Sequence, residues 1–282
     1  MSLPVFYTPR MIADARSYSP SASKPAALVA AWLESGLDIT VREPTAATVA
    51  ELELAHDPRY VADILSGRRP NGFGNTSAEV ASSLPFTTGA MLSAARHALT
   101  ERTIACAPCS GFHHASYDRP AGFCTFNGLM VTALALHREG ARSIGILDCD
   151  MHDGDGTDAI LTRLEVGHVV KHWNTGARFS DKSQAAEFLA HLPVIARDFD
   201  GCDVVLYQAG ADPHVDDPLG GWLTTEELRR RDHIVFETLT SLRIPVAWNL
   251  ARGYQRAPDG TIPKVLEIHT NTALEALSVL RC

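Results

Sequence analysis

The residues whose chemistry stands out most follow a short apolar run in the middle of the chain. Residues 144–157 read Ile-Gly-Ile-Leu-Asp-Cys-Asp-Met-His-Asp-Gly-Asp-Gly-Thr. The run at 144–147 predicts a buried strand, and residues two apart on an extended chain point to the same face. Asp148, Asp150 and His152 would therefore converge, and a cation between them would relieve their repulsion and desolvation. Such a set leaves room for a third ligand and an open position, which is typical of a catalytic metal rather than a structural one.

Two other structures produce an Asp- and Gly-rich segment after a strand. The first is a solvated turn with nothing bound, which this segment alone does not exclude. The second is an EF-hand calcium loop, which also begins Asp-x-Asp. Here the sixth loop position is Asp153 instead of Gly and the twelfth is Ala159 instead of Glu, so we exclude an EF-hand. Gly154 and Gly156 would let the backbone fold tightly around a bound group.

The composition is that of an ordinary globular protein. The chain has 282 residues, of which 45% are hydrophobic, and a formal net charge of -8. This charge does not favour nucleic acid or an anionic membrane as a partner. The first ten residues lack a signal-peptide pattern and no apolar run approaches membrane length, so we expect a cytoplasmic location. Among six scattered cysteines only Cys106 and Cys109 have metal or redox spacing, and without a second pair we expect reduced thiols.

Apolar runs alternate with helical patterns along the chain. Strands are expected at 5–8, 103–107, 144–147, 166–172, 204–208, 244–250 and 262–268. Helices are expected at 24–35, 45–56, 58–67, 87–99, 127–139, 183–191 and 224–242, and from residue 272 onward. This alternation predicts an α/β fold with a mostly parallel sheet covered by helices on both faces. Because there is no internal repeat or low-complexity tract, we expect one domain over residues 1–282.

Polar clusters follow four of the expected strands. They are residues 109–115 (Cys-Ser-Gly-Phe-His-His-Ala), 148–157, 209–221 (Ala-Gly-Ala-Asp-Pro-His-Val-Asp-Asp-Pro-Leu-Gly-Gly) and 251–254 (Ala-Arg-Gly-Tyr). In open α/β sheets, ligands bind at the carboxyl ends of the strands, so four such clusters predict a single site. Asp150, His152 and Asp212 would give a metal site with two carboxylates, one imidazole and open coordination, which is suited to activating water.

Further polar side chains in these clusters suit acid–base chemistry. His113 and His114 are adjacent, so their rings diverge unless the loop bends them inward, and Asp148 and Asp155 could orient them. Tyr254 follows a glycine and could donate its hydroxyl group to a developing oxyanion. Taken alone, the histidines could equally be an exposed loop pair and the tyrosine a packed loop aromatic.

The same motifs resemble those of the histone deacetylase and acetylpolyamine amidohydrolase superfamily, in particular its bacterial histone-deacetylase-like members. The likeness runs from about Tyr7 to the Ile-His-Thr-Asn-Thr segment at 268–272. The matching motifs are Gly-Phe-His-His-Ala (111–115), Ala-Gly-Phe-Cys-x-Phe-Asn (121–127), Asp-x-Asp-x-His-x-Gly-Asp-Gly-Thr (148–157), Ala-Gly-Ala-Asp with Asp-Pro-Leu-Gly-Gly (209–221) and Gly-Tyr (253–254). The resemblance implies the arginase/deacetylase-like fold and a zinc-dependent deacetylase-type amidohydrolase.

The resemblance also implies the cofactors. Asp150, His152 and Asp212 would bind the catalytic Zn²⁺. Family members often hold K⁺ next to the zinc through Asp148 and the backbone carbonyls of 148–152. The serine that usually completes the potassium site has no clear counterpart near 170–172 in this sequence.

The resemblance gives roles to the remaining catalytic candidates. His113 and His114 would be the general base and its electrostatic or acid partner. Asp148 would orient the first of them and Asp155 the second. Tyr254 would polarise the acyl carbonyl and stabilise the tetrahedral oxyanion.

The substrate pocket combines matching and departing residues. Gly122 and Phe123 would line the channel for the acyl amine. Arg252, the third substrate-binding candidate, replaces a glycine of the usual Gly-Gly-Tyr. This long cation would narrow the pocket, neutralise Asp153 or point to solvent. Asp153 itself adds a carboxylate beside the metal ligands, because the family usually has a second histidine there. Both departures bear on substrate size and on rate.

Three functions are consistent with these residues. The main hypothesis is a zinc-dependent amidohydrolase acting on acetyl-lysine, an acetylpolyamine or another small N-acyl amine. The second is a dinuclear manganese ureohydrolase, because Asp212, His214 and Asp216 spell Asp-x-His-x-Asp, although the paired histidines and the tyrosine then have no role. The third is a catalytically weak relative that binds an acylated ligand or a partner protein, which Asp153 and Arg252 motivate. The sequence does not select the substrate or distinguish zinc from iron, and it is compatible with an oligomer.

Overall fold

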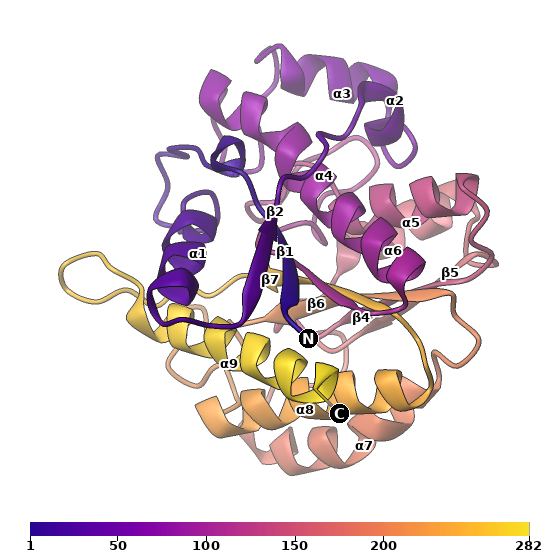
Figure 1. Cartoon of the computed structure of the whole chain (residues 1–282). Helices are drawn as coiled ribbons and strands as arrows, with labels where there is room; N and C mark the ends of the chain where they lie inside the picture. Colours follow the sequence, from indigo (N-terminus) through magenta and orange to yellow (C-terminus); the bar gives the residue numbers. More distant parts are fainter. Residues whose placement is uncertain (282) are drawn as a thin grey trace.

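A parallel sheet of seven strands lies at the centre of the computed structural model, which describes residues 1–281 (Figure 1). The strands are β1 (Leu3–Phe6), β2 (Ile39–Arg42), β3 (Ile104–Ala107), β4 (Ile144–Asp148), β5 (Val170–Asn174), β6 (Val204–Gly210) and β7 (Val246–Ala251). Their order is β2-β1-β3-β7-β6-β4-β5, and every neighbouring pair is parallel. Parallel neighbours require crossover connections, which the helices provide, so the predicted α/β fold is confirmed.

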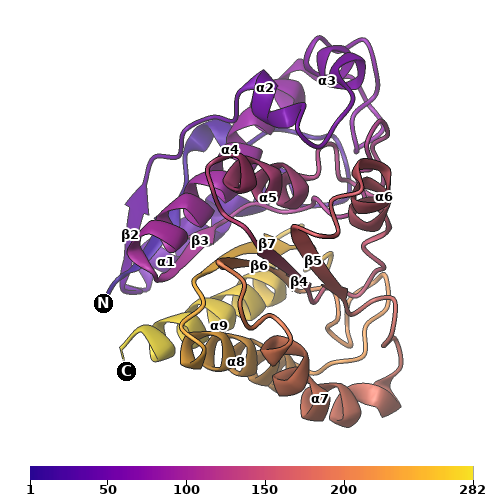
Figure 2. The ribbon, with the colours of Figure 1, turned by 90° about the vertical axis from the view of Figure 1, so that its right-hand side faces the viewer.

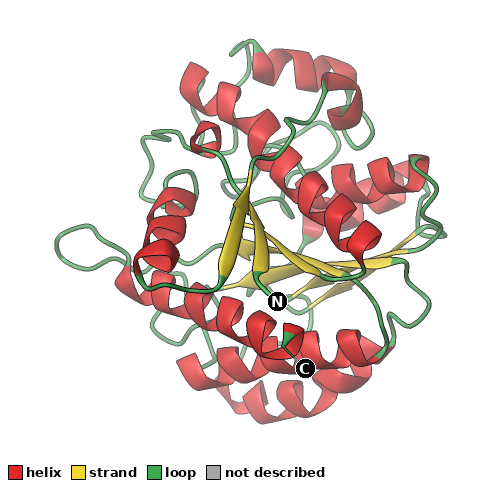
Figure 3. Ribbon diagram, viewed as in Figure 1, coloured by secondary structure: helices red, strands yellow, loops and turns green. Residues whose placement is uncertain are grey.

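Helices cover both faces of the sheet (Figure 2; Figure 3). One face carries α2 (Val49–Leu52), α3 (Pro58–Leu65), α4 (Ala78–Glu101), α5 (Gly128–Arg138) and α6 (Asp155–Leu164). The other carries α1 (Lys24–Glu34), α7 (Ala185–Arg197), α8 (Thr225–Ser241) and α9 (Pro263–Leu280). Short 3-10 turns lie at Pro9–Met11 and Lys182–Gln184. Within residues 1–281, no helix is long and apolar enough to cross a membrane.

The alternation of side chains along the strands divides the core into two layers. On β6, Val204 and Leu206 pack in the layer under α3 to α6, whereas Val205 and Tyr207 pack in the layer under α7 to α9. All four side chains are fully buried. Because both faces of the sheet are dry, the ends of the strands are where polar side chains can gather. The extent of the domain, 1–282, stays a prediction.

Two expected elements differ from the structure near the termini. Residues 262–268 are not a strand, because they form the first turns of α9, in which Pro263 takes an N-terminal position that tolerates its missing N–H group. The helix expected from Thr45 shortens to α2. Thr48 starts it through a capping box with Glu51.

Other boundaries also differ from the sequence pattern. Helix α4 begins at Ala78 rather than at Thr87 and continues through Pro85, so its first turns precede the stretch that has clear helical spacing. The sequence pattern does not predict β2, an edge strand whose residues are mostly exposed. It does not predict α6 either, because its Asp-Gly-rich start has the composition of a turn. In the structure Asp155 and Asp158 lie in the first turn of α6, where the helix dipole favours negative charge.

A buried histidine fixes the segment that connects β3 to α5. His56 Nδ1 donates to the carbonyl oxygens of Ser116 (3.0 Å) and Tyr117 (3.2 Å), and Nε2 accepts the backbone N–H of Asn127 (2.8 Å). One ring nitrogen donates and the other accepts, which requires the neutral imidazole. Burial accordingly lowers the pKa of His56 to about 4. The ends of the segment 116–127 are thereby held next to the N-terminus of α3.

We expect acid to destabilise the metal-free protein partly through His56. Its folded-state pKa is below that of an unfolded chain, so the unfolded state binds more protons between pH 6.5 and 4 and gains stability as the pH falls. The pKa shift corresponds to a contribution of about 3 kcal/mol to the free energy of unfolding. This contribution is present above pH 6.5 and is lost towards pH 4. Urea unfolding across this pH range should show that a His56→Gln variant is less stable than the wild type at neutral pH. On acidification the variant should lose less stability than the wild type.

His191→Gln is the matched control, because this histidine is exposed on α7. It should show the same pH dependence as the wild type. Parallel stability profiles for the wild type and His56→Gln would contradict the role given to His56.

Candidate active site

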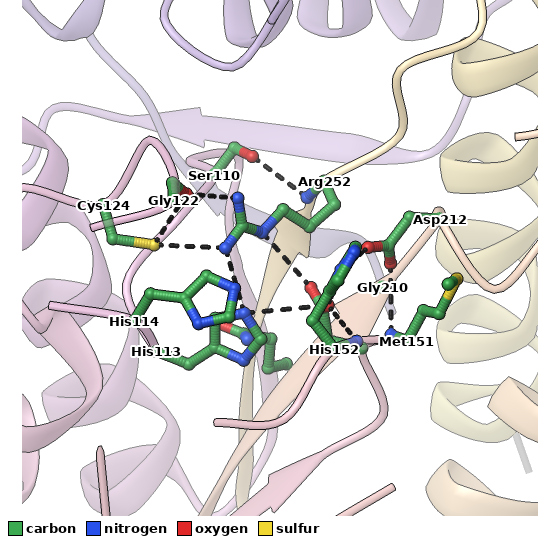
Figure 4. Close-up of polar contacts among 12 residues, drawn as sticks. Ser110, His113, His114, Gly122, Cys124, Met151, His152, Gly210, Asp212 and Arg252 are labelled. Atoms are coloured by element: carbon green, nitrogen blue, oxygen red, sulfur yellow. Dashed lines mark hydrogen bonds and ion pairs between the residues drawn. The ribbon is translucent and has the colours of Figure 1, made fainter. Parts of the chain in front are cut away.

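The four polar clusters meet at the carboxyl end of the sheet. Strands β3, β7, β6 and β4 are consecutive neighbours in the sheet, so the loops that follow them are neighbours as well. Figure 4 shows side chains from all four loops converging on one region. Ligands of open α/β sheets bind in this position.

Asp150, His152 and Asp212 form a group with ligand atoms within 4.8 Å of one another. His152 Nδ1 lies 2.8 Å from Asp212 Oδ2 and 3.3 Å from Asp150 Oδ1. Both carboxylates are fully buried, and Asp150 Oδ2 has no hydrogen-bond partner among the described residues. An orphaned buried carboxylate oxygen is costly unless a cation satisfies it. Two carboxylates and one imidazole therefore fit a divalent metal with open coordination positions.

The charges of this group act strongly on one another. Hydrogen bonds to Asp150 and Asp212 raise the pKa of His152 to about 10. Burial and the nearby charge of Asp150 raise the pKa of Asp212 to about 7. A proton held between the imidazole and the two carboxylates takes the place that a metal ion would fill, so metal binding would displace it.

The paired histidines lie on a sharp turn after β3. Phe112 has a φ of +136°, a value that L-residues rarely adopt, and it follows Gly111 with a φ of +85°. The turn brings the rings of His113 and His114 side by side, with centroids 4.1 Å apart. A Cβ atom on Gly156 would lie 2.4 Å from the carbonyl carbon of His114. Only glycine therefore lets the start of α6 pack against this turn.

A carboxylate lies behind each of the two rings. His113 Nδ1 donates to Asp148 Oδ2 at 2.8 Å, and His114 Nδ1 donates to Asp155 Oδ1 at 2.7 Å. His113 is fully buried, whereas His114 remains partly accessible. Burial, the neighbouring His113 and a nearby arginine lower the pKa of His114 to about 4. His114 is therefore neutral near pH 7.

Arg252 lies inside the site and not in solvent (Figure 4). Its side chain is buried, and its φ of +56° is left-handed. Nη1 donates to Tyr254 Oη at 2.6 Å and to the carbonyl oxygen of Gly122. Nη2 lies 3.0 Å from His113 Nε2, and Nε lies 3.6 Å from Asp150 Oδ2. Of the three orientations expected for this residue, the structure excludes the one that points to solvent and shows the side chain turned into the site.

The contact with Arg252 bears on the protonation of His113. Burial lowers the pKa of His113, but the carboxylates of Asp150 and Asp148 outweigh it and raise the pKa to about 9. A guanidinium group only donates, so its hydrogen bond requires an unprotonated Nε2. The guanidinium group and a proton therefore compete for Nε2 of His113.

Asp153 does not contact Arg252 or the paired histidines. It is exposed, and its carboxylate accepts a hydrogen bond from Asn174 Nδ2. Arg252 therefore does not neutralise it. The carboxylate that distinguishes this chain from the usual motif belongs to the surface beside β5.

Gly122 and Phe123 stand next to the histidines and the tyrosine. Gly122 has a φ of +48°, and a Cβ atom there would lie 2.4 Å from His114 Cδ2. The ring of Phe123 lies 5.7 Å from that of Tyr254. Tyr254 is itself buried, and its backbone N–H donates to Asp217 Oδ2 at 2.8 Å. These residues form one wall of the site.

Three residues to which the sequence assigns no role hold the candidate catalytic residues in place. Gln208 Nε2 donates to both carboxylate oxygens of Asp148 at 3.2 Å, and Asp217 holds the backbone of Tyr254. Lys24 Nζ donates to the carbonyl oxygens of Leu250 (2.8 Å) and Arg252. Gln208 could have been found from the sequence, because it is a polar residue at the end of the apolar run of β6. No local signal exists for Lys24, because its partners lie at the other end of the chain.

The Asp-x-His-x-Asp motif does not build a second metal site. His214 Nδ1 accepts from the backbone N–H of Asp216 (3.2 Å) and from Gln255 Nε2 (2.8 Å), while Nε2 pairs with Thr225 Oγ1 (2.9 Å). Both ring nitrogens are thus engaged. The side chain of Asp216 is 75% exposed. Only Asp212 of this motif reaches the site, which leaves the dinuclear ureohydrolase without structural support.

Comparison with protein families agrees with this arrangement. The sequence model of the histone deacetylase domain family matches residues 20–179 of this chain. These residues include both paired histidines and two of the metal-ligand candidates. The chain belongs to the histone deacetylase family. An uncharacterised protein of Picosynechococcus is 29% identical over 240 residues, covering 77% of this chain and 79% of its own length. Membership of the histone deacetylase family supports a deacetylase-type hydrolase.

Further relatives match over shorter segments or in fold. Histone deacetylase 6 of Caenorhabditis elegans is 31% identical over 148 residues, which are 41% of this chain and only 15% of that protein. The crystal structure of the HD domain of HDA15 superposes with a TM-score of 0.79 at 18% identity, covering 99% of this chain and 90% of the other. This likeness shows that the fold is that of histone deacetylases.

We expect Asp212→Asn to weaken metal binding and Asp216→Asn to leave it unchanged. The first variant removes a buried, charged ligand candidate, and the second changes an exposed residue of the same motif. Loss of a supporting residue costs about 10- to 100-fold in affinity, so loss of a ligand should cost at least about 100-fold. Competition with a chromophoric zinc chelator measures both affinities. Equal zinc affinities for the two variants would show that the metal binds elsewhere.

Proposed function

We propose that this protein is a zinc-dependent amidohydrolase that cleaves a small N-acyl amine, such as acetyl-lysine or an acetylpolyamine. The observation that carries the proposal is the convergence of the metal-ligand candidates with the paired histidines and Tyr254 at one end of the sheet. Membership of the histone deacetylase family supports the same reaction class.

Asp150, His152 and Asp212 would hold the catalytic metal. When bound, such an ion lowers the pKa of a water molecule and polarises an acyl carbonyl group. Zinc and iron both accept these ligands. We propose zinc, and metal analysis of the purified protein tests this choice. A potassium ion next to Asp148 also stays a prediction. The Asp148 carbonyl oxygen, which would bind it, accepts hydrogen bonds from the hydroxyl group and the backbone N–H group of Thr175, both at 2.9 Å.

The paired histidines would move the protons of the reaction. Their Nδ1 atoms donate to Asp148 and Asp155, which fixes the tautomer with the lone pair on Nε2. His114, which is neutral near pH 7, can take a proton from the attacking water. The amine must leave protonated, and the same pair can return that proton to its nitrogen. His113 contacts buried carboxylates, which favour positive charge on its ring. Once the guanidinium group of Arg252 has left Nε2, His113 would take up a proton there and stabilise the oxyanion electrostatically.

Tyr254 would donate its hydroxyl group to the developing oxyanion. Burial raises the pKa of this hydroxyl group above its usual value, so it keeps its proton. Asp217 fixes its backbone, and Arg252 contacts its oxygen. A preorganised donor of this kind acts in a site from which water is largely excluded.

A second candidate function has one observation in its favour. Arg252 bridges Tyr254 and His113, the two groups that would flank the reacting carbonyl group. If that bridge persists in the metal-loaded protein, the site binds an acylated ligand and turns it over slowly or not at all. Turnover measurements on the metal-loaded protein separate the two candidates.

We expect Tyr254→Phe to lower kcat by about 100- to 1,000-fold on any amide that the wild type cleaves, because one oxyanion donor is lost. Tyr117→Phe is the matched control, since it keeps the ring over which Arg163 lies at 5.2 Å. Its rate should equal that of the wild type. Metal analysis should find one zinc per chain in all three proteins, and the rates are measured on acetyl-lysine peptides and acetylpolyamines.

Two results would contradict the proposal. Two manganese ions per chain would favour a ureohydrolase. One zinc with no hydrolysis across acetyl, acidic and longer acyl amides would favour the ligand-binding candidate.

A further inference from the structure

Arg252 occupies the space between the two groups that would flank a reacting acyl group. One guanidinium nitrogen lies 2.6 Å from Tyr254 Oη. Another lies 3.0 Å from His113 Nε2 (Figure 4). An acyl carbonyl group cannot approach both groups while the guanidinium group stays there. A productive ligand must therefore displace the guanidinium group and offer it another partner.

Within residues 1–281, no carboxylate lies at hydrogen-bond distance from the guanidinium group. It donates to neutral acceptors: a phenol oxygen, the Gly122 carbonyl oxygen and His113 Nε2, with Cys124 Sγ at 3.4 Å. The nearest carboxylate oxygen is Asp150 Oδ2, 3.6 Å from Nε. The Nε–H group is buried and has no hydrogen-bond partner among the described residues. A buried guanidinium charge is stable only when an anion compensates it.

Metal binding would increase this need for an anion. A divalent ion on Asp150, His152 and Asp212 would replace the one proton that they share, so the charge of this group would become more positive by one unit. Asp148 already accepts hydrogen bonds from His113, Gln208 and the backbone of Asp150, on the side of the His113 ring away from Arg252. Arg252 would then be a buried cation whose nearest carboxylate is committed to the metal.

The backbone of Arg252 is fixed by hydrogen bonds that do not involve its side chain. Lys24 binds its carbonyl oxygen, and its N–H group donates to Ser110 Oγ at 3.1 Å. The side chain is held by the neutral acceptors described above and by the 3.6 Å ion pair with Asp150. A carboxylate is a stronger, two-pronged acceptor for guanidinium than any of these neutral acceptors. An anionic ligand can therefore draw the guanidinium group away from Tyr254 and His113 while the loop stays in place.

We propose that Arg252 selects N-acyl amines whose acyl group ends in a carboxylate, with succinyl as the representative chain length. This inference rests on the amidohydrolase function proposed above and specifies its substrate class. The acyl carboxylate pairs with the guanidinium group, which frees Tyr254 Oη and His113 Nε2 for the amide carbonyl group. Water adds to the carbonyl carbon, the C–N bond breaks, and the amine leaves with a proton, so the products are a dicarboxylate and an amine.

Product binding to the zinc-loaded full-length protein tests the proposal without turnover. Succinate and acetate both offer one carboxylate to the metal, and only succinate offers a second to Arg252. Calorimetric titration should show that the wild type binds succinate at least about tenfold more tightly than acetate. Arg252→Gln should abolish the preference. Arg252→Gly should do the same, and glycine suits the φ of +56°.

Arg256→Gln is the matched control. It removes one positive charge from the same loop, but this arginine is exposed and its guanidinium group binds the carbonyl oxygens of Tyr18 and Gly260. Its preference for succinate should equal that of the wild type. Equal affinities for succinate and acetate in the wild type, or a preference that survives in both Arg252 variants, would overturn the proposal.

Turnover distinguishes this proposal from the function on which it rests. N-succinyl amines should be cleaved at least about tenfold faster than N-acetyl amines by the wild type, with the order reversed in Arg252→Gly. Equal cleavage of both amides by the wild type would retain the amidohydrolase and reject the role of Arg252. Arg252-dependent succinate binding without cleavage of either amide would reject the hydrolase and keep the site as one for acidic acyl groups.

Discussion

Buried negative charge is the constraint on which the rest of the site depends. Asp148, Asp150 and Asp212 are all fully buried where β4 and β6 end. Burying a carboxylate without a partner would reduce the stability of the fold by roughly several kcal/mol. The first is satisfied by an imidazole, an amide and a backbone N–H group. The other two share His152, and Asp150 Oδ2 has no hydrogen-bond partner in the described part of the chain, so this region fits a bound cation.

The parallel sheet makes such a concentration of charge tolerable. Its strands are buried on both faces, so polar groups gather only beyond their ends, and neighbouring strands deliver their loops to the same place. Close backbone packing then sets the distances. Gly156 lets α6 pack against the turn of the paired histidines, and Gly122 lets its loop pass over the ring of His114. A side chain at either position would push the catalytic candidates apart.

Arg252 changes the electrostatic balance of this arrangement. A glycine at this position would leave the wall of the pocket neutral and open. The arginine instead introduces a permanent positive charge beside the metal-ligand candidates and between the paired histidines and Tyr254. In the role proposed for it, this charge would make substrate choice depend on charge as well as on size. In this member of the histone deacetylase family, one departure from the usual motif, Arg252, thus lies among the proposed catalytic residues, and the other, Asp153, lies on the surface.

The sequence by itself determined the alternation of strands and helices, because buried strands need apolar runs, and it also picked out the polar residues at their ends. It misplaced residues 262–268, since an apolar run of that length suits a strand or a buried helix equally, and packing of α9 against α8 decides between them. Only the tertiary structure revealed Lys24 under the loop after β7 and the inward course of Arg252. Their partners are distant in sequence, and a long flexible cation takes its direction from the charges and acceptors that the folded chain brings around it.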